Sequence, residues 1–223
     1  MSRHIVVTGA SRGIGLELVA QALARGDRAS ALMRRRPAPM PAALEEAAVL
    51  HADVTRPESL AAAAADLAAP VDILVCNAGV YRGRGRIGDP VFGPDAWEET
   101  LMANIAGPYL TVEAFLPRLA EGARVAIVSS IMGSSARAPG GSYIYRASKA
   151  GATNLACNLA ADLRERGIAV GSYHPGWVRT DMGGGSADID AATSAAGLLA
   201  RFDALSMETT GVFEDYAGEA IPF

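Results

Sequence analysis

Short runs of β-forming residues alternate with longer helical patterns along almost all of this 223-residue chain. Residues 14–25 repeat apolar side chains at the spacing of one helix face, whereas residues 71–76 form a continuous apolar run typical of a strand buried on both faces. Strands are predicted at Ile5–Thr8, Ala29–Met33, Val49–Ala52, Val71–Cys76, Arg124–Ser130, Ile168–Tyr173 and Gly211–Phe213. Helices are predicted at Ile14–Arg25, Ser59–Leu67, Trp97–Leu119, Tyr145–Arg166 and Ile189–Phe202. The alternation predicts an α/β protein with a doubly wound, mostly parallel sheet of about seven strands and helices on both faces.

No stretch rich in Pro, Gly or Ser is long enough to link two domains. Hydrophobic residues make up 50% of the chain, so a chain of this length can bury a large core. We therefore expect residues 1–223 to form a single domain. In doubly wound sheets, ligands bind beyond the carboxyl ends of the strands, so the functional residues are expected in the loops that follow the strands.

Charge and cysteine usage argue against several classes of partner. The net charge is −4, without the basic stripe that nucleic-acid binding normally requires. Cys76 and Cys157 lie far apart and match no metal-ligand spacing, so we expect two free thiols and no metal. No apolar run approaches the roughly 20 residues that span a bilayer, and no signal peptide precedes the first strand. The chain is expected to be soluble and cytoplasmic.

A glycine-rich turn, Thr8-Gly9-Ala10-Ser11-Arg12-Gly13-Ile14-Gly15, follows the first predicted strand and opens the first predicted helix. Glycines at these positions allow a tight turn and a close approach of the backbone to a pyrophosphate, whose charge the helix N-terminus favours. The spacing is G-x-x-x-G-x-G, and a purely structural turn is the alternative. The expected cofactor contacts are Gly9, Ser11, Arg12, Gly13, Ile14 and Gly15.

Tyr145 and Lys149 lie four residues apart on a predicted helix and therefore share one of its faces. A nearby ammonium favours phenolate, so the pair predicts a tyrosine pKa lowered toward neutral pH, as a general acid or base needs. Lys149 is the only lysine of the chain, beside nineteen arginines. This usage suggests a function that a guanidinium does not supply. The pattern Y-x-x-x-K alone is common by chance, so two unrelated helix residues remain the alternative.

Ser129 and Ser130 end the predicted strand at 124–130. A hydroxyl at this position can donate a hydrogen bond to a carbonyl oxygen on which negative charge develops. A hydrolytic serine nucleophile is the alternative, but the chain has no G-x-S-x-G motif and its three histidines include no evident partner base.

Together these residues resemble the short-chain dehydrogenase/reductase family over essentially the whole chain. The landmarks are Thr8–Gly15, Asp53-Val54, Cys76-Asn77-Ala78-Gly79, Asn104 in Met102-Ala103-Asn104-Ile105, Ser130, the pair Tyr145 and Lys149, and Pro175-Gly176 followed by Thr180. One departure is Cys76, where the family often has an asparagine. The resemblance implies a Rossmann fold and a nicotinamide-dependent oxidoreductase. Taken singly, several of these positions also suit ordinary turns, helix caps or solvent-facing residues.

The resemblance also implies a role for each matched position. Tyr145 would exchange a proton with the substrate oxygen, Ser130 would hydrogen-bond that oxygen, and Lys149 would hold the ribose hydroxyls and tune Tyr145. Asn104 would position a water that links Lys149 to solvent. The remaining cofactor contacts would be Asp53 and Val54 at the adenine end, Asn77, Ala78 and Gly79 along the cofactor, and Pro175, Val178 and Thr180 at the carboxamide.

The end of the second predicted strand reads Met33-Arg34-Arg35-Arg36 and contains no acid. An acid at this position usually binds the free ribose of NAD, whereas an arginine accommodates a 2′-phosphate. Arg34, with Arg12 approaching from the glycine turn, therefore predicts NADP(H) in preference to NAD(H). A solvated basic loop is the alternative.

The segments after Ser130 and Thr180 set the substrate in this family. The motifs are most similar to the sniffer and C-factor-like carbonyl reductase branch, which implies a small ketone, aldehyde or quinone. Met132, Tyr143, Trp177 and Met182 are candidate pocket walls or, equally, core residues. The glycine-rich segment 181–186 is expected to be a mobile lid. A homodimer or homotetramer is implied by the family, and a non-catalytic, nicotinamide-binding signalling protein remains the alternative function.

Overall fold

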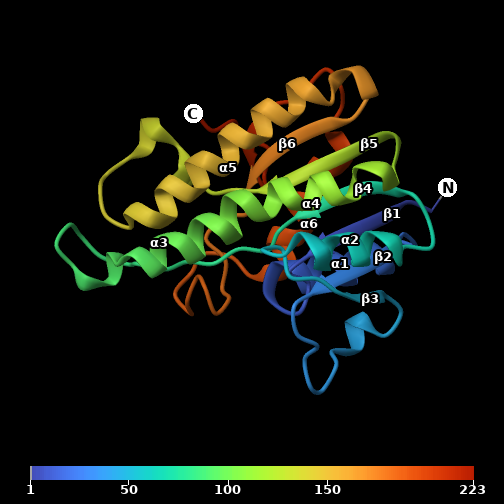
Figure 1. The fold of residues 1–223 in the computed structure, drawn as a ribbon, viewed down its shortest axis with the longest axis horizontal. Helices are drawn as coiled ribbons and strands as arrows, with labels where there is room; N and C mark the ends of the chain where they lie inside the picture. Colours follow the sequence, from blue (N-terminus) through green and yellow to red (C-terminus); the bar gives the residue numbers. More distant parts are fainter. Residues whose placement is uncertain (1) are drawn as a thin grey trace.

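A computed structural model describes residues 2–223. Within this range the strands form one seven-stranded sheet in the order β3-β2-β1-β4-β5-β6-β7, and every neighbouring pair is parallel. The strands are β1 (His4–Thr8), β2 (Arg28–Met33), β3 (Ala48–His51), β4 (Val71–Cys76), β5 (Leu119–Val128), β6 (Ala169–His174) and β7 (Phe213–Asp215). The predicted doubly wound α/β fold is confirmed (Figure 1).

Helices cover both faces of this sheet because its strands are apolar on both sides. The helices are α1 (Gly13–Ala24), α2 (Pro57–Ala65), α3 (Pro94–Leu101), α4 (Gly107–Phe115), α5 (Tyr143–Asp162) and α6 (Ala191–Ala204). Residues of α2, α4 and α5 share one core cluster with Val6, whereas α1 and α6 share the other with Ile5 and Val7. This alternation of neighbouring strand residues between two cores follows from the two-residue period of a strand.

One long helix was predicted at Trp97–Leu119, and this is wrong in two respects. A π-helical turn at Met102–Ala106 separates α3 from α4, and the Gly107 N–H donates to Met102 O five residues earlier. Pro108 explains the wider turn, because it has no N–H for the fourth preceding carbonyl and its ring would clash there. The helical segment then ends in a 3-10 turn at Leu116–Arg118, and β5 begins at once.

The last strand also differs from its prediction at Gly211–Phe213, since β7 covers Phe213–Asp215. Gly211 precedes the strand with a positive φ of 92°, although its N–H already donates to Val170 O at 2.7 Å. The strand predicted at Arg124–Ser130 is also displaced, since β5 begins five residues earlier, at Leu119, and ends at Val128. The remaining predicted strands and helices lie within about four residues of the observed ones. None of the helices in residues 2–223 is long and apolar enough to cross a membrane.

The strand order reverses between β1 and β4, because the chain first adds β2 and β3 on one side and then returns to the other. Ligands bind at such a reversal, beyond the carboxyl ends of the strands. In Figure 1, α3 and the first turns of α5 project past the sheet on the left, beside the loops that follow the strands. Tyr145 and Lys149 lie in these first turns of α5.

Candidate active site

Tyr145, Lys149, Ser130 and Asn104 are all buried at the carboxyl-end side of the sheet. They come from three elements: α5, the residues that follow β5, and the π-helical turn between α3 and α4. The exposed fractions are 8%, 6%, 6% and 1%, respectively. Four polar side chains withdrawn from water at one place require specific partners, because unpaired buried polar groups are costly.

The Asn104 side chain joins two segments. Its Oδ1 accepts from Val80 N at 2.8 Å, and its Nδ2 donates to Val80 O and to Ser148 Oγ, both at 2.9 Å. Ser148 Oγ in turn donates to Tyr145 O at 2.8 Å. The π-helical turn therefore fixes the loop after β4 against the first turn of α5 through a single amide.

Lys149 points toward the sheet, where its Nζ donates to Val128 O at 2.7 Å. Its ammonium lies 5.7 Å from the centroid of the Tyr145 ring. A Cβ at Gly79 would lie 3.6 Å from Nζ and 3.0 Å from Asn104 Oδ1, so this glycine leaves room for both groups. Burial lowers the pKa of the Lys149 ammonium to about 8.

The structure corrects one expectation about Tyr145. Burial raises the pKa of its phenol to about 12, and the interaction with the Ser130 hydroxyl offsets this only in part. The predicted lowering by Lys149 is not observed, because the ammonium is bound to Val128 O and lies beside the ring. Tyr145 is therefore protonated at neutral pH.

The two serines after β5 face different surroundings. Ser129 Oγ is buried against α5, where it donates to Lys149 O at 3.0 Å and contacts Thr153 Oγ1 at 2.6 Å. Ser130 Oγ accepts from Met132 N at 3.1 Å, which leaves its hydroxyl proton available. Ser130 interacts with Tyr145, and its hydrogen bond to a substrate oxygen stays a prediction. Ser129 instead anchors α5 to the sheet.

The glycine-rich turn packs tightly against the end of β4. Gly9 has a positive φ of 69°, and a Cβ there would lie 2.9 Å from Ala78 Cα. A Cβ at Gly15 would lie 2.5 Å from Gly9 O and 2.6 Å from Asn77 Nδ2. Thr8 Oγ1 accepts from the N–H groups of Asn77 and Ala78 at 3.0 and 3.1 Å. These glycines are needed because the two loops leave no space for side chains.

The helix N-terminus beside this turn is free to accept an anion. Ser11, Arg12, Gly13 and Ile14 complete the turn and enter α1. Arg12 stands at the N-cap position and makes no side-chain capping hydrogen bond. Because side-chain caps normally satisfy the first N–H groups, their absence suits a phosphate of a bound nucleotide.

Residues predicted at the adenine end lie after β2 and β3. Asp53 Oδ1 accepts from Thr55 N at 3.0 Å and from Thr55 Oγ1 at 2.7 Å. Partial burial opposes ionisation of Asp53, yet these bonds and the charge of Arg34 hold its pKa below the ordinary value. Val54 packs on α4, where a Cβ at Gly107 would lie 3.0 Å from its Cγ2.

Arg12 and Arg34 do not lie against the same partner. Arg12 Nη1 forms an ion pair with Asp181 Oδ2 at 2.8 Å, and both side chains are about three-quarters exposed. Arg34 is exposed at the end of β2. Arg12 therefore links the glycine turn to the segment after β6, whereas Arg34 remains directed to solvent.

The segment after β6 closes over the glycine turn. Thr180 Oγ1 donates to Val178 O at 3.3 Å and accepts from Gly183 N at 3.1 Å, and a Cβ at Gly13 would lie 3.3 Å from Thr180 Cγ2. Val178 forms a parallel bridge with Ile189. At the start of the segment, Pro175 O accepts from Ser194 Oγ at 2.6 Å. The expected mobility of residues 181–186 remains a prediction.

The candidate pocket walls are distributed around the site. Trp177, Met182 and Tyr143 are 49%, 38% and 38% exposed, and Met132 is half-buried. Tyr143 faces outward, where its ring meets Phe92 edge to face and lines a hollow of about 340 Å³.

Sequence reasoning missed Tyr81, whose ring stacks on that of Tyr145 with centroids 4.1 Å apart and planes inclined by 18°. Arg84 lies over Tyr81, with Cζ 4.5 Å from the ring centroid. The sequence offered one signal for Tyr81 and Arg84, namely their position, because both follow Asn77-Ala78-Gly79 within a few residues.

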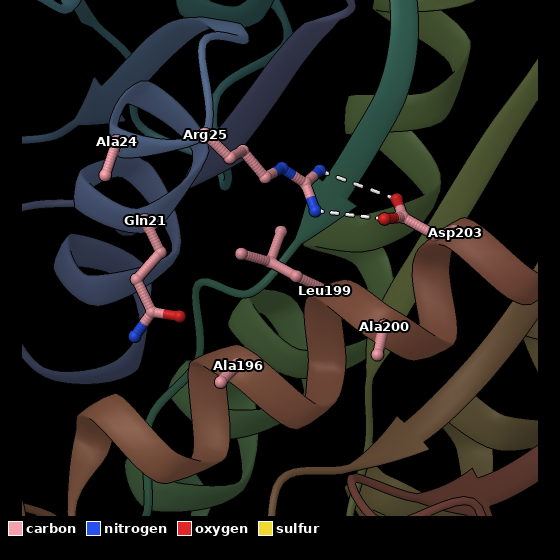
Figure 2. Close-up of a pocket in the computed structure, with 7 residues that line it drawn as sticks. All are labelled: Gln21, Ala24, Arg25, Ala196, Leu199, Ala200 and Asp203. Carbon is pink, nitrogen blue, oxygen red and sulfur yellow. Dashed lines mark hydrogen bonds and ion pairs between the residues drawn. The ribbon is translucent and has the colours of Figure 1, made fainter.

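A second hollow, of about 440 Å³, lies between α1 and α6 and is lined by Gln21, Ala24, Arg25, Ala196, Leu199, Ala200 and Asp203. Figure 2 shows Arg25 directed across it from α1 to Asp203 on α6. The C-terminal end of α1 leads into the start of β2. This hollow therefore lies toward the amino ends of the strands, whereas the buried polar cluster lies at their carboxyl ends.

Comparisons with known proteins agree with this arrangement. A family model described as short chain dehydrogenase matches residues 3–189. The chain is 42% identical to the C-signal protein of Myxococcus xanthus over 157 residues, which are 69% of this chain and 93% of that protein. It is 35% identical to the 1-hydroxy-2-glutathionyl-2-methyl-3-butene dehydrogenase of a Rhodococcus species over 224 residues, with 96% of each chain covered.

Solved structures are similar over the whole chain. The NADPH-bound carbonyl reductase from chicken fatty liver has a TM-score of 0.88 and 30% identity, with 100% of this chain and 99% of that chain covered. The carbonyl reductase Sniffer of D. melanogaster has a TM-score of 0.89 and 27% identity, with both chains fully covered at 100%. The predicted family and its sniffer and C-factor-like branch are confirmed. The chain belongs to the short-chain dehydrogenase/reductase family of oxidoreductases.

Proposed function

We propose that this protein is an NADP(H)-dependent reductase of small carbonyl compounds, a ketone, aldehyde or quinone, with Tyr145 as the proton donor. The observation that carries the proposal is the buried cluster of Tyr145, Lys149, Ser130 and Asn104 beside a glycine turn at the carboxyl ends of the strands. Because the buried phenol is protonated at neutral pH, it can donate a proton to a carbonyl oxygen.

The residues around the glycine turn and the end of β2 fit a nicotinamide adenine dinucleotide phosphate. Gly9 and Gly15 keep the turn free of side chains, α1 offers an uncapped N-terminus, and Arg34 supplies an exposed cation where an acid would select NAD(H). When bound, the cofactor supplies the hydride. Lys149 would hold its ribose hydroxyls. The other proposed contacts are Ser11, Arg12, Gly13, Ile14, Asp53, Val54, Asn77, Ala78, Gly79, Pro175, Val178 and Thr180.

The chain's own residues then divide the work of proton transfer. Ser130 donates a hydrogen bond to the substrate oxygen and aligns it with the Tyr145 hydroxyl. Tyr145 donates its proton to that oxygen as negative charge develops there. The Lys149 ammonium lies 5.7 Å from the centroid of the Tyr145 ring, where it would hold the ribose hydroxyls of the cofactor beside the phenol. Asn104 holds Val80 and Ser148 in place and positions the water through which Lys149 exchanges protons with solvent.

The first test compares wild type with Tyr145→Phe in NADPH consumption against a panel of aldehydes, ketones and quinones. Loss of the proton donor should reduce kcat/KM by about 10²–10⁴-fold, the usual contribution of general acid catalysis. NADPH binding, followed by fluorescence, should be retained, because the substitution removes only the hydroxyl. Equal turnover by the two proteins would contradict the mechanism.

The cofactor preference is tested with Arg34→Ala, alone and combined with Arg12→Ala. Removing a charge-assisted contact to the 2′-phosphate should reduce the preference for NADPH over NADH by about tenfold or more. Because Arg12 is paired with Asp181, Arg34→Ala should account for most of the effect of the double variant. Unchanged selectivity in the double variant would rule out NADP(H) recognition by these arginines.

A non-catalytic, nicotinamide-binding signalling protein is the second candidate, favoured by the 42% identity to the C-signal protein. Under this alternative, wild type and Tyr145→Phe bind NADPH equally and neither consumes it with any carbonyl compound. The acid/base cluster favours the enzyme, because a binding protein has no need of a buried proton donor.

A further inference from the structure

The segment after β4 carries three arginines at alternate positions, in Tyr81-Arg82-Gly83-Arg84-Gly85-Arg86. This is a dense positive run in a chain of net charge −4. We call residues 81–86 the arginine segment. None of its residues has a role in the proposed proton transfer, yet it begins two residues after Gly79, which lies against Lys149 and Asn104.

The arginine segment is docked on the start of α5, the helix that carries Tyr145. Gly85 O accepts from Ser142 N at 2.9 Å, and the Tyr81 hydroxyl is bonded to Ser142 Oγ at 2.8 Å. At its far end, Arg86 N donates to Asp89 Oδ2 at 2.6 Å. These bonds give the segment a defined position at the rim of the site.

Within it, Arg84, Tyr81 and Tyr145 form a stack. The Arg84 guanidinium covers one face of Tyr81 at 4.5 Å, and the Tyr145 ring lies 4.1 Å from the Tyr81 centroid. Stacked cations of this kind are held by the ring quadrupole. Although burial dominates the pKa of Tyr145, the charge of Arg84 is near enough to lower it. Arg84 is thus one aromatic ring removed from the proton donor.

Arg84 also reaches the opposite rim of the site, where its Nη2 donates to Met182 O. Met182 lies in the segment after β6, which also contains Trp177, another of the candidate pocket walls. The guanidinium therefore bridges the segment after β4 and the segment after β6.

The charge of Arg84 is not neutralised by the protein. Arg82 is paired with Glu99 at 2.9 Å, and Arg12 with Asp181 at 2.8 Å. Across residues 2–223, Arg84 has no carboxylate within 4.0 Å. The guanidinium carries five N–H groups, one of which donates to Met182 O, and a carboxylate can accept two of the others in parallel.

From this placement we propose that Arg84 binds a carboxylate carried by the substrate, so that the enzyme prefers carbonyl compounds bearing a negative charge. The proposal rests on the proposed reductase function and adds the substrate class. It assigns a specificity-determining residue outside the acid/base cluster, with Tyr81 as the rigid support that holds the guanidinium at the rim.

The test uses para-formylbenzoate and meta-formylbenzoate against their methyl esters, which keep the aldehyde and the ring but lack the charge. For wild type, kcat/KM should be at least about tenfold higher for one formylbenzoate than for its ester, as expected of a charge-assisted bidentate contact. Arg84→Gln should reduce this ratio to about one. Arg84→Lys should give an intermediate ratio, because it keeps the positive charge without the paired N–H donors of the guanidinium. Arg82→Gln, which removes an arginine of the same segment that is already paired with Glu99, should keep the wild-type ratio.

A second readout separates the charge from any change of shape. Raising the ionic strength should diminish the wild-type ratio by screening, and it should have no effect on the ratio of Arg84→Gln. A ratio near one in wild type, or a ratio that survives in Arg84→Gln, overturns the anion site while reduction of the esters leaves the reductase function standing. An increase in the KM for NADPH in Arg84→Gln, with the ratio unchanged, would assign Arg84 to the cofactor instead. Failure of wild type to reduce any of the four aldehydes and the wider carbonyl panel overturns both proposals.

Discussion

At the scale of single residues, burial decides the protonation states of the site. Tyr145 and Lys149 share a helix face as the sequence predicted, yet the phenol has a pKa of about 12 and the ammonium a pKa of about 8. Each shift favours the neutral form, as removal from water requires. Burial of the Lys149 ammonium therefore lowers the free energy of unfolding.

Because this burial is destabilising, we expect Lys149→Met to be more stable than wild type at pH 7. At that pH the ammonium is charged in both the folded and the unfolded protein, and folding must desolvate it. The gain should be about 1–3 kcal/mol, since one unit of pKa is worth about 1.4 kcal/mol and the bond to Val128 O is lost.

The gain should shrink as pH rises from about 8 toward 10.5, because wild-type Lys149 is then neutral in the folded state while the unfolded chain still binds the proton. Urea unfolding at neutral pH and at about pH 10 measures both values. A gain that does not change with pH would mean that shape, and not charge, explains it.

At the scale of elements, a single proline alters the helix between β4 and β5. The turn at Met102–Ala106 is π-helical, and its Asn104 connects Val80 to Ser148. Hydrophobic periodicity extends through both α3 and α4, so the sequence pattern predicts one helix. The effect of Pro108 on the backbone is local, and its consequence for Asn104 follows only from the packing around it.

Pro108→Ala should let this turn relax toward a regular α-helix. The free energy of unfolding should rise or stay constant, whereas kcat/KM should fall by about tenfold or more because Asn104 changes its angular position. Thermal unfolding and NADPH consumption measure the two effects. Pro94→Ala, in the first turn of α3 where proline is well tolerated, is the matched control and should change neither quantity appreciably. Loss of activity in both variants would exclude a specific effect of the π-helical turn.

At the scale of the whole molecule, a network of ion pairs joins the chain's beginning to α1 and α6. Asp27 accepts from Arg25 Nε at 2.6 Å and lies 3.4 Å from Arg3 Nη2, and both arginines also contact Asp203. Figure 2 shows the part of this network that crosses the hollow between the helices. This network lies toward the amino ends of the strands, away from Tyr145, so it should stabilise the fold without affecting the chemistry.

Asp27→Asn should reduce the free energy of unfolding by about 1–2 kcal/mol at pH 7 and leave kcat/KM unchanged. Partial burial opposes ionisation of Asp27, but the bonds from Arg3 and Arg25 hold its pKa below 3.8. Its stabilising effect is therefore fully present above pH 3.8 and disappears as pH falls through the lowered value. Denaturant unfolding from neutral pH into the acid range should show the two proteins converge. Glu58→Gln, which removes an exposed pair with Arg56, should differ from wild type by less than about 0.5 kcal/mol.

Three broader expectations stay predictions at this scale. A single domain over residues 1–223 is supported by core clusters that each run along one face of the same sheet. A homodimer or homotetramer stays a prediction, as does a cytoplasmic location. Sedimentation of the purified protein measures the oligomeric state.

Asn104 was identified only through the resemblance to the family. Local sequence by itself determined the strand and helix alternation, the glycine turn, the placement of Ser130 after a strand, and the shared helix face of Tyr145 and Lys149. These features depend on backbone geometry within a few residues, such as the two-residue period of a strand and the shared face of positions four apart on a helix. Gly9 and Gly15 were identifiable for the same reason, because a close approach of two backbones excludes side chains whatever surrounds it.

Only the tertiary structure decided the protonation of Tyr145, the pairing of Arg12 with Asp181 and the stack of Arg84 on Tyr81. Each depends on how far a group is withdrawn from water or which charge from a distant segment lies beside it. Desolvation and Coulomb interactions act through space, so neighbours in the chain do not report them. The location of the chemistry was therefore readable from local pattern, whereas its protonation states and the cation at its rim followed from packing.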